Sequence, residues 1–292
     1  MAGYIGNKAV NLSTSGADIS GTAVTDGLTV AGNVSVDGGT IKLDGNYPVG
    51  TGNVALGDLS FASLQSGASN NVSIGYYSGN ALTTGDNNTA LGAYAVHKTT
   101  TASGNTGVGR GAMYENSTGA SNTALGDQAL YFNTTASNNT AVGHQAGYSN
   151  TTGTANVAIG SAALYDNTTG IRITAVGREA LTNNTSGNHN TGIGYQAMLT
   201  NTTGNYNVSV GYESLNSNTT ASYNTAVGYQ AGYANTTGLY ETFVGAYAGA
   251  GNTTGEGNSA LGVQALETNS TGAYNTALGR FALKSNTTAS NN

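Results

Sequence analysis

The chain has no cysteine, only one proline and few charged residues, which make up 8% of its 292 residues. Without cysteine, neither disulfides nor thiolate chemistry can contribute to stability or function. The Lys and Arg residues number only eight and the net charge is −6, so the basic surface that nucleic-acid binding requires is missing. We therefore expect no nucleic-acid partner.

Long apolar runs are absent as well. No segment approaches the roughly 20 apolar residues of a membrane-spanning helix, and residues 1–8 lack the basic patch and apolar run of a signal peptide. We expect no membrane insertion and no cleavable N-terminal signal. Scarce charge and proline, with a periodic aliphatic residue, argue against disorder. The 45 glycines and the Asn-Thr-Thr runs argue against helix.

What the chain does contain is a short repeat, clearest as Asn-Thr-Ala-Leu-Gly at 122–126. Its last residue, here called the anchor glycine, recurs after one step of 18 residues and then in steps of 17. The anchors are Gly57, Gly75, Gly92, Gly109, Gly126, Gly143, Gly160, Gly177, Gly194, Gly211, Gly228, Gly245, Gly262 and Gly279. A fixed period of this length is typical of a solenoid. We predict an all-β, parallel β-roll or β-helix of 14 coils over residues 49–292.

The strand before each anchor shows two different requirements. The residue before the anchor is aliphatic in all fourteen copies, and the residue two before it is small in thirteen, Phe243 being the exception. Neighbouring side chains of a strand point to opposite faces. We predict that the aliphatic side chain fills the coil and that the small one faces outward. A small-only outer face indicates close packing against other copies, so we expect a homotrimer of intertwined or side-by-side rolls.

The rest of the coil predicts a ladder, a second strand and a turn. Asn stands four before the anchor in twelve of fourteen copies, broken by Ile173 and Glu241, and can form a hydrogen-bonded ladder. Ala or Ser three after the anchor, followed in many coils by Leu or Met, predicts a second buried strand. Asn-Thr-Thr-Gly, seven to ten after the anchor, predicts a turn whose Gly adopts a positive φ. The extra residue of the 18-residue unit falls in this turn, between Gly67 and Asn71.

Residues 1–48 are interpreted as a separate N-terminal leader. From Leu28 on, short runs alternate apolar and polar residues between Gly turns, which predicts strands of three to four residues. Strands this short need partners, in other chains or under the first coil. The Asp-Gly-Gly at 37–39 is interpreted as a tight turn and not a calcium loop, because no further carboxylates are spaced as ligands.

The polar residues predict no catalytic, cofactor or metal site. The 14 acidic residues form neither a column nor the close pairs that glycoside hydrolysis uses. His97, His144 and His189 occupy three different coil positions, which does not suit a metal centre. No Gly-rich phosphate loop precedes a helix. We expect a protein that is not an enzyme.

Tyrosine forms the one pattern that suggests binding. Sixteen of the 18 tyrosines lie in the array, in columns one, two, five and twelve residues after the anchor. They alternate there with charged and polar residues, so the columns face water or a groove between subunits. Exposed Tyr can stack on sugars of a host surface; the alternative is that Tyr ladders stiffen the rod. The candidate receptor or glycan contacts are Tyr114, Tyr131, Tyr148, Tyr165 and Tyr233.

The Asn-Thr-Ala-Val-Gly core with a small residue three later resembles the head repeats of YadA-type trimeric autotransporter adhesins, which are left-handed parallel β-rolls packed as trimers. The longer unit at 224–238 is similar to arrays in tail fibres of marine and cyanobacterial phages, and so are residues 4–8 followed by 28–34. The resemblance implies a homotrimeric tail fibre of the virion, a rigid shaft that contributes to host attachment. It also implies that the leader joins other tail proteins, and that the receptor is a host surface glycan or protein.

Departures from these families leave alternatives open. The adhesins carry a secretion signal and a C-terminal membrane anchor, and neither is visible, which favours the phage fibre over a bacterial cell-surface adhesin. Phage fibres of this kind often end in a receptor tip or a self-cleaving chaperone domain, whereas this sequence stops where another repeat would begin. We expect the array to continue in a longer parent or a partner to cap it. An ice-binding solenoid is a further alternative, disfavoured because Thr168 and Thr169 point to opposite faces.

Overall fold

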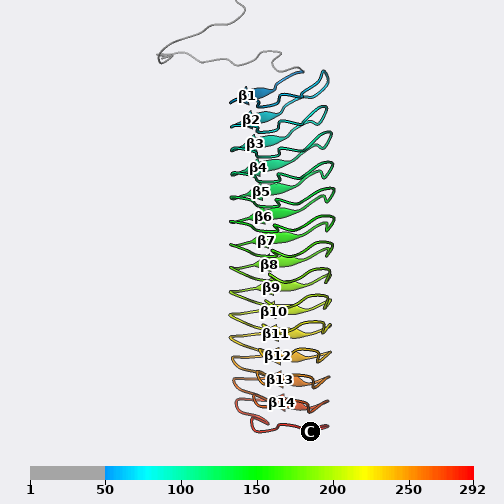
Figure 1. The fold of residues 1–292 in the computed structure, drawn as a ribbon. Helices are drawn as coiled ribbons and strands as arrows, with labels where there is room; N and C mark the ends of the chain where they lie inside the picture. Colours follow the sequence, from blue (N-terminus) through cyan, green and yellow to red (C-terminus); the bar gives the residue numbers. More distant parts are fainter. Residues whose placement is uncertain (1–49) are drawn as a thin grey trace, which may run out of the picture. The chain divides into compact units, whose positions relative to one another are not determined.

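The computed structural model describes residues 50–292, which all belong to one unit, Leu43–Asn292. They form a solenoid with one three-residue strand in each coil (Figure 1). The strands are β1 (Val54–Leu56), β2 (Val72–Ile74), β3 (Thr89–Leu91), β4 (Thr106–Val108), β5 (Thr123–Leu125), β6 (Thr140–Val142), β7 (Val157–Ile159), β8 (Thr174–Val176), β9 (Thr191–Ile193), β10 (Val208–Val210), β11 (Thr225–Val227), β12 (Thr242–Val244), β13 (Ser259–Leu261) and β14 (Thr276–Leu278). The predicted all-β solenoid is confirmed. Within residues 50–292 no helix is long and apolar enough to cross a membrane.

The strands pair in parallel and in chain order as a single 14-stranded sheet. Each residue lies beside its equivalent in the next repeat, as Leu125 does beside Val142. The 18-residue first step keeps this register, because Val54 pairs with Val72 and the extra residue is absorbed in the turn. Every repeat position therefore forms a straight column along the solenoid. The predicted leader strands lie outside the described residues.

The prediction of which strand face points inward was wrong. The small residue two before the anchor points into the coil, where Ala124 is 0% exposed, while the aliphatic residue before the anchor points outward, where Leu125 is 47% exposed. The reason is the thinness of the coil. At Gly192, an added Cβ would already lie 3.1 Å from Leu181 Cγ and 3.3 Å from the Ala197 carbonyl oxygen. Even a methyl group would be crowded there, so the interior of this coil has no room for a larger aliphatic side chain opposite the strand.

The predicted second strand was also wrong, although its residues are buried. Ala180 and Leu181 are both 0% exposed, but Leu181 has a left-handed φ of 52°. Glu179 and His189 are left-handed as well, and the same three positions recur in most coils. Left-handed residues turn the chain sharply, and the backbone still bonds coil to coil, as Leu181 N does to Ala197 O at 3.0 Å. The roll is closed by left-handed turns facing a single sheet.

Two columns of buried asparagine fill the remaining interior and confirm the predicted ladder. In the column four before the anchor, Asn122 N–H donates to Asn105 Oδ1 at 3.0 Å and Asn122 Nδ2 to Ala136 O at 2.8 Å. A second ladder runs seven after the anchor, where Asn133 Nδ2 donates to Asn116 Oδ1 at 2.8 Å. Buried polar groups cost free energy unless they are hydrogen-bonded. These amides meet that condition because the equivalent asparagines of successive coils bond to one another.

The positive φ predicted for the Asn-Thr-Thr-Gly turn occurs elsewhere. From Gly85 on, no glycine at the end of that turn has a positive φ. The anchor glycines have one instead, between 114° and 141°, outside the region that L-residues adopt readily. At Gly177, an added Cβ would lie 2.4 Å from the carbonyl oxygen of Gly194. Backbone conformation and the close approach of the next coil both require glycine at the anchor.

Replacing one anchor, Gly177→Ala, is expected to lower the free energy of unfolding by about 1–3 kcal/mol from backbone strain alone, with the contact to Gly194 adding to it. Chemical denaturation at fixed protein concentration measures the loss. The matched control is Gly147→Ala, because Gly147 has a φ of 60° that Leu and Met adopt in other coils, and its nearest atom is a methyl of Leu130. Equal losses in the two variants would contradict a special role for the anchor.

Candidate functional site

The outer face of the sheet carries two columns of exposed or partly exposed side chains over all fourteen strands. The aliphatic column consists of the residues before the anchors, such as Leu91 at 43% and Leu261 at 50% exposure. The threonine column consists of the residues three before the anchors, which are Thr in nine coils, Val in four and Ser in one. Neither column contains a charged residue. Here this surface is called the apolar face.

The side chains of this face are aliphatic groups and the methyl and hydroxyl groups of threonine and serine. Isolated monomers rarely expose long contiguous apolar patches, and larger ones mark interaction surfaces. Sequence reasoning noticed the aliphatic column but placed it inside. The signal that could have corrected this was the small residue two before the anchor in thirteen of fourteen coils, since a thin core restricts side-chain size more severely than a surface does.

Tyrosine ladders run along the outside of the coils, as one of the two interpretations of the Tyr columns predicted. Tyr114, Tyr131, Tyr148 and Tyr165 stack with ring centroids 5.0, 5.4 and 4.9 Å apart. The structure thus brings together four of the five predicted contacts. Tyr233 occupies the same column but stands apart, because the three intervening coils hold Thr182, Leu199 and Asn216 there.

Two more ladders border the apolar face between β9 and β12. Tyr195, Tyr212 and Tyr229 follow the strands, with centroids 5.1 and 5.2 Å apart. His189, Tyr206, Tyr223 and Tyr240 precede the strands and stack in the same way. Several of these rings are about half exposed, including Tyr223 at 53%. Aromatic rings with a polar tip are favoured at interfaces, so this segment of the apolar face has aromatic borders.

Ring burial shifts the ionisation of the first ladder. Burial raises the pKa of the Tyr131 hydroxyl above its usual range, and the neighbouring Tyr114 and Tyr148 raise it further. Burial also raises the pKa of Tyr165. Tyrosine is already neutral at physiological pH with its ordinary pKa, and these upward shifts do not change that; a neutral hydroxyl can both donate and accept hydrogen bonds.

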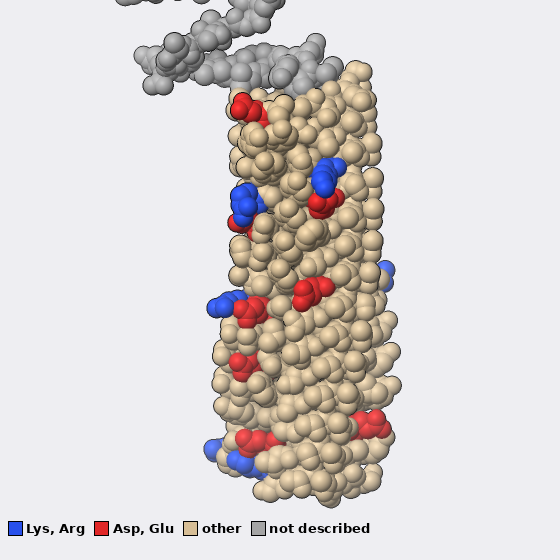
Figure 2. All heavy atoms as spheres, in the orientation of Figure 1, with Lys and Arg blue, Asp and Glu red and all other residues tan. Residues whose placement is uncertain are grey.

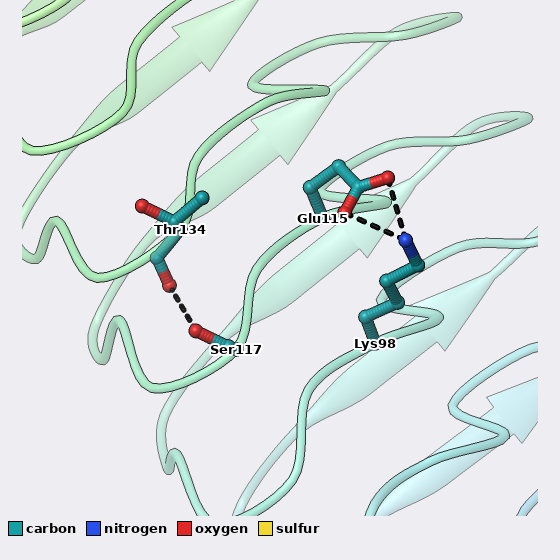
Figure 3. A network of polar contacts seen from close by, with 4 residues as sticks. All are labelled: Lys98, Glu115, Ser117 and Thr134. Carbon is teal, nitrogen blue, oxygen red and sulfur yellow. Dashed lines mark hydrogen bonds and ion pairs between the residues drawn. The ribbon is translucent and has the colours of Figure 1, made fainter.

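Charged side chains are sparse on the surface shown in Figure 2, and several lie beside a group of opposite sign. Lys98 Nζ lies 2.8 Å from Glu115 Oε2 in the next coil, next to a second coil-to-coil contact in which Ser117 Oγ donates to Thr134 O (Figure 3). Exposed pairs of this kind contribute about 0–1 kcal/mol. Their larger effect is to leave the surface locally neutral.

The comparisons with known proteins come down to one finding. No protein-family model, curated protein or solved structure matches the chain. Within residues 50–292 no three His, Asp or Glu side chains lie close enough to hold a metal ion. Two histidines belong to ring stacks instead: His97 lies 4.9 Å from Tyr114 and His189 lies 4.8 Å from Tyr206, measured between ring centroids. The candidate functional site is therefore the apolar face, because its exposed aliphatic column has no role within a single chain.

Proposed function

We propose that this protein is a structural fibre protein, a homotrimer of solenoids packed through their apolar faces into a rigid shaft. The observation that carries the proposal is the uninterrupted aliphatic column from Leu56 to Leu278. Burying apolar surface stabilises by about 25 cal/mol per Å², and a column repeated in register over fourteen coils supplies this contribution along the whole length. Self-association follows from the face, and the number three follows from the resemblance to trimeric β-rolls.

The biological setting proposed is a phage tail fibre that contributes to host attachment. Support for a shaft comes from the stacking itself, because each coil bonds to the next through backbone, asparagine and ring contacts. The leader is proposed to join other tail proteins, and a host surface glycan or protein to be the receptor. A bacterial cell-surface adhesin would use the same shaft, so a membrane anchor in the full gene would favour it.

The structure also revives a second candidate, an ice-binding solenoid. The expectation against it relied on Thr168 and Thr169, yet a different set of threonines, including Thr123 and Thr140, lines the outer face beside the aliphatic column. Regular Thr and Val columns on a flat sheet suit an ice-binding surface. Ice binding needs this face exposed to water, whereas the fibre buries it between subunits. Thermal hysteresis together with a monomer in solution would therefore favour ice binding.

The fibre proposal predicts a trimer in sedimentation equilibrium at micromolar concentration. The double substitution Val176→Lys with Ile193→Lys puts two charges on the apolar face. Desolvating unpaired charges costs several kcal/mol, so we expect the affinity of self-association to fall at least 100-fold. The control, Thr152→Lys with Thr169→Lys, adds the same two charges at exposed turn residues and should stay trimeric. A monomeric wild-type chain, or a Val176→Lys/Ile193→Lys variant as associated as the control, would contradict the proposal.

A further inference from the structure

One column of side chains beside the first tyrosine ladder is interrupted. In the column two after the anchor, the Tyr94 ring lies on the Tyr77 ring, with centroids 5.7 Å apart and planes at 18°. The next coil has Gly111 in this column, and the one after it has Gln128. Tyr77 covers one face of Tyr94, whereas the coil on the other side has no side chain in this column; its Tyr114, in the neighbouring column, lies 6.0 Å from Tyr94 at a tilt of 53°. The aromatic stack therefore lacks a rung at Gly111.

A hollow of about 300 Å³ opens at this missing rung, lined by Tyr94, Arg110, Gly111, Tyr114, Gln128 and Tyr131. Tyr114 and Tyr131, stacked at 3°, form its wall. An added Cβ at Gly111 would lie 3.2 Å from Tyr131 Cε2, so the Tyr131 ring lies close to the backbone at Gly111. Tyr94 and Gln128 stand two coils apart, about 9.6 Å at the usual strand spacing. That gap admits one ring in contact with both.

The polar groups around the hollow are donors held in neutral surroundings. Arg110 Nη2 donates to Asp127 Oδ2 at 3.0 Å, which leaves the other guanidinium donors available. Gln128 Oε1 accepts from Gln145 Nε2 at 2.9 Å, and the Gln128 amide nitrogen makes no hydrogen bond within residues 50–292. The charge of Arg110 is balanced by Asp127, so an anionic ligand gains little here.

We propose that this hollow binds one neutral hexopyranose residue of a glycan. The apolar C–H face of the sugar stacks on the side of Tyr94 that lines the hollow at Gly111, and its hydroxyls accept hydrogen bonds from Arg110 and Gln128. A ligand without hydroxyls would cover these donors and leave them unpaired, which is costly. Pockets of this size with aromatic walls and a few polar groups are typical of small-ligand sites. The site deepens the proposed host-attachment role and rests on it only for the source of the sugar.

Saturation-transfer NMR on the full chain tests the site, with the methyl glycosides of glucose, galactose, mannose and N-acetylglucosamine as probes. We expect transfer to at least one of them, with Kd on the order of 1 mM. Gly111→Gln restores the missing rung with the residue that stands in this column in the next two coils, and Gln128 already adopts a φ of 57° there. This variant should lower binding at least tenfold.

The matched control is Ala162→Gln, the same new side chain in the same column but away from the hollow, which should bind like the wild type. Equal melting temperatures for both variants exclude misfolding as the cause of a loss. Absence of transfer to every neutral glycoside, transfer only to methyl glucuronide, or full binding by Gly111→Gln would overturn the site. Sedimentation of the same samples keeps the two proposals separate, since a monomer that binds sugar contradicts only the fibre and a trimer that does not contradicts only the site.

Discussion

Replacing Phe243 by alanine is expected to lower the free energy of unfolding by about 3–5 kcal/mol, the range for removing a buried phenylalanine ring. Phe243 is 0% exposed and is the one large side chain on the inner faces of β1–β14. Its ring lies between Gly232 and Gly249, where an added Cβ would come within 2.8 and 2.5 Å of ring carbons. Other coils hold Leu or Met in place of these glycines, so the variant would leave a cavity spanning two coils.

A second substitution distinguishes a cavity from a general loss of folding. Gly249→Leu places the residue found at the equivalent Leu181 and Leu266, and Gly249 already has the left-handed φ of 59° that this position requires. Alone it clashes with the ring and destabilises; combined with Phe243→Ala it should recover at least half of the lost stability. Denaturant unfolding of all four proteins gives the coupling free energy. Additive losses would show that the ring and the two glycines are not a packing unit.

The same packing unit shows what the repeat could and could not reveal. The period alone predicted a solenoid of parallel strands in register, because only identical stacked coils explain fourteen aliphatic residues at fixed spacing. The inward face could not be assigned by the rule that large apolar residues are buried. Phe243 indicates which face points inward. It is the one large residue in a column of small residues, and Gly232 and Gly249 stand on either side of it where other coils have Leu or Met. Such compensation occurs between neighbours in a packed interior.

The candidate site was predictable in its columns and not in its gaps. Counting from the anchor placed Tyr114 and Tyr131 in one line, and a repeating register makes residues in one line stack. The hollow at Gly111 could not be predicted, because one glycine among many does not indicate a cavity until the positions of the surrounding rings are known. The left-handed conformations could not be predicted for a related reason. Leu181 and Met198 have no preference for positive φ, and only the packing of the surrounding coils imposes it.

The buried carboxyl of Glu241 makes the stability of the solenoid depend on pH. Glu241 replaces asparagine in the ladder and is 1% exposed. Its N–H donates to Asn224 Oδ1 at 2.9 Å, and its Oε2 accepts from Asn258 N–H at 3.0 Å. Burial raises the pKa of this carboxyl from its ordinary 4.5 to about 8. A protonated carboxyl offers both a donor and an acceptor, as the asparagine amide does, so the neutral form suits the ladder.

Glu241→Gln is therefore expected to remove a pH dependence that the wild type shows between pH 4.5 and 8. In that window the folded state holds the proton and the unfolded state has released it. Wild-type stability thus falls by about 1.4 kcal/mol per pH unit, by roughly 5 kcal/mol in total, and levels off above pH 8. The glutamine variant should match the wild type near pH 4.5 and exceed it most at pH 8.

Denaturant unfolding at half-unit pH intervals measures this difference. Glu213→Gln is the control, because it makes the same change on the coil surface, where glutamine stands in several other coils, and it should keep the wild-type slope. A wild type with constant stability across the window, or a Glu241→Gln variant that keeps the slope, would show that the ladder accepts the carboxylate. The result bears on the whole solenoid, since one ladder position then sets the pH at which fourteen stacked coils are most stable.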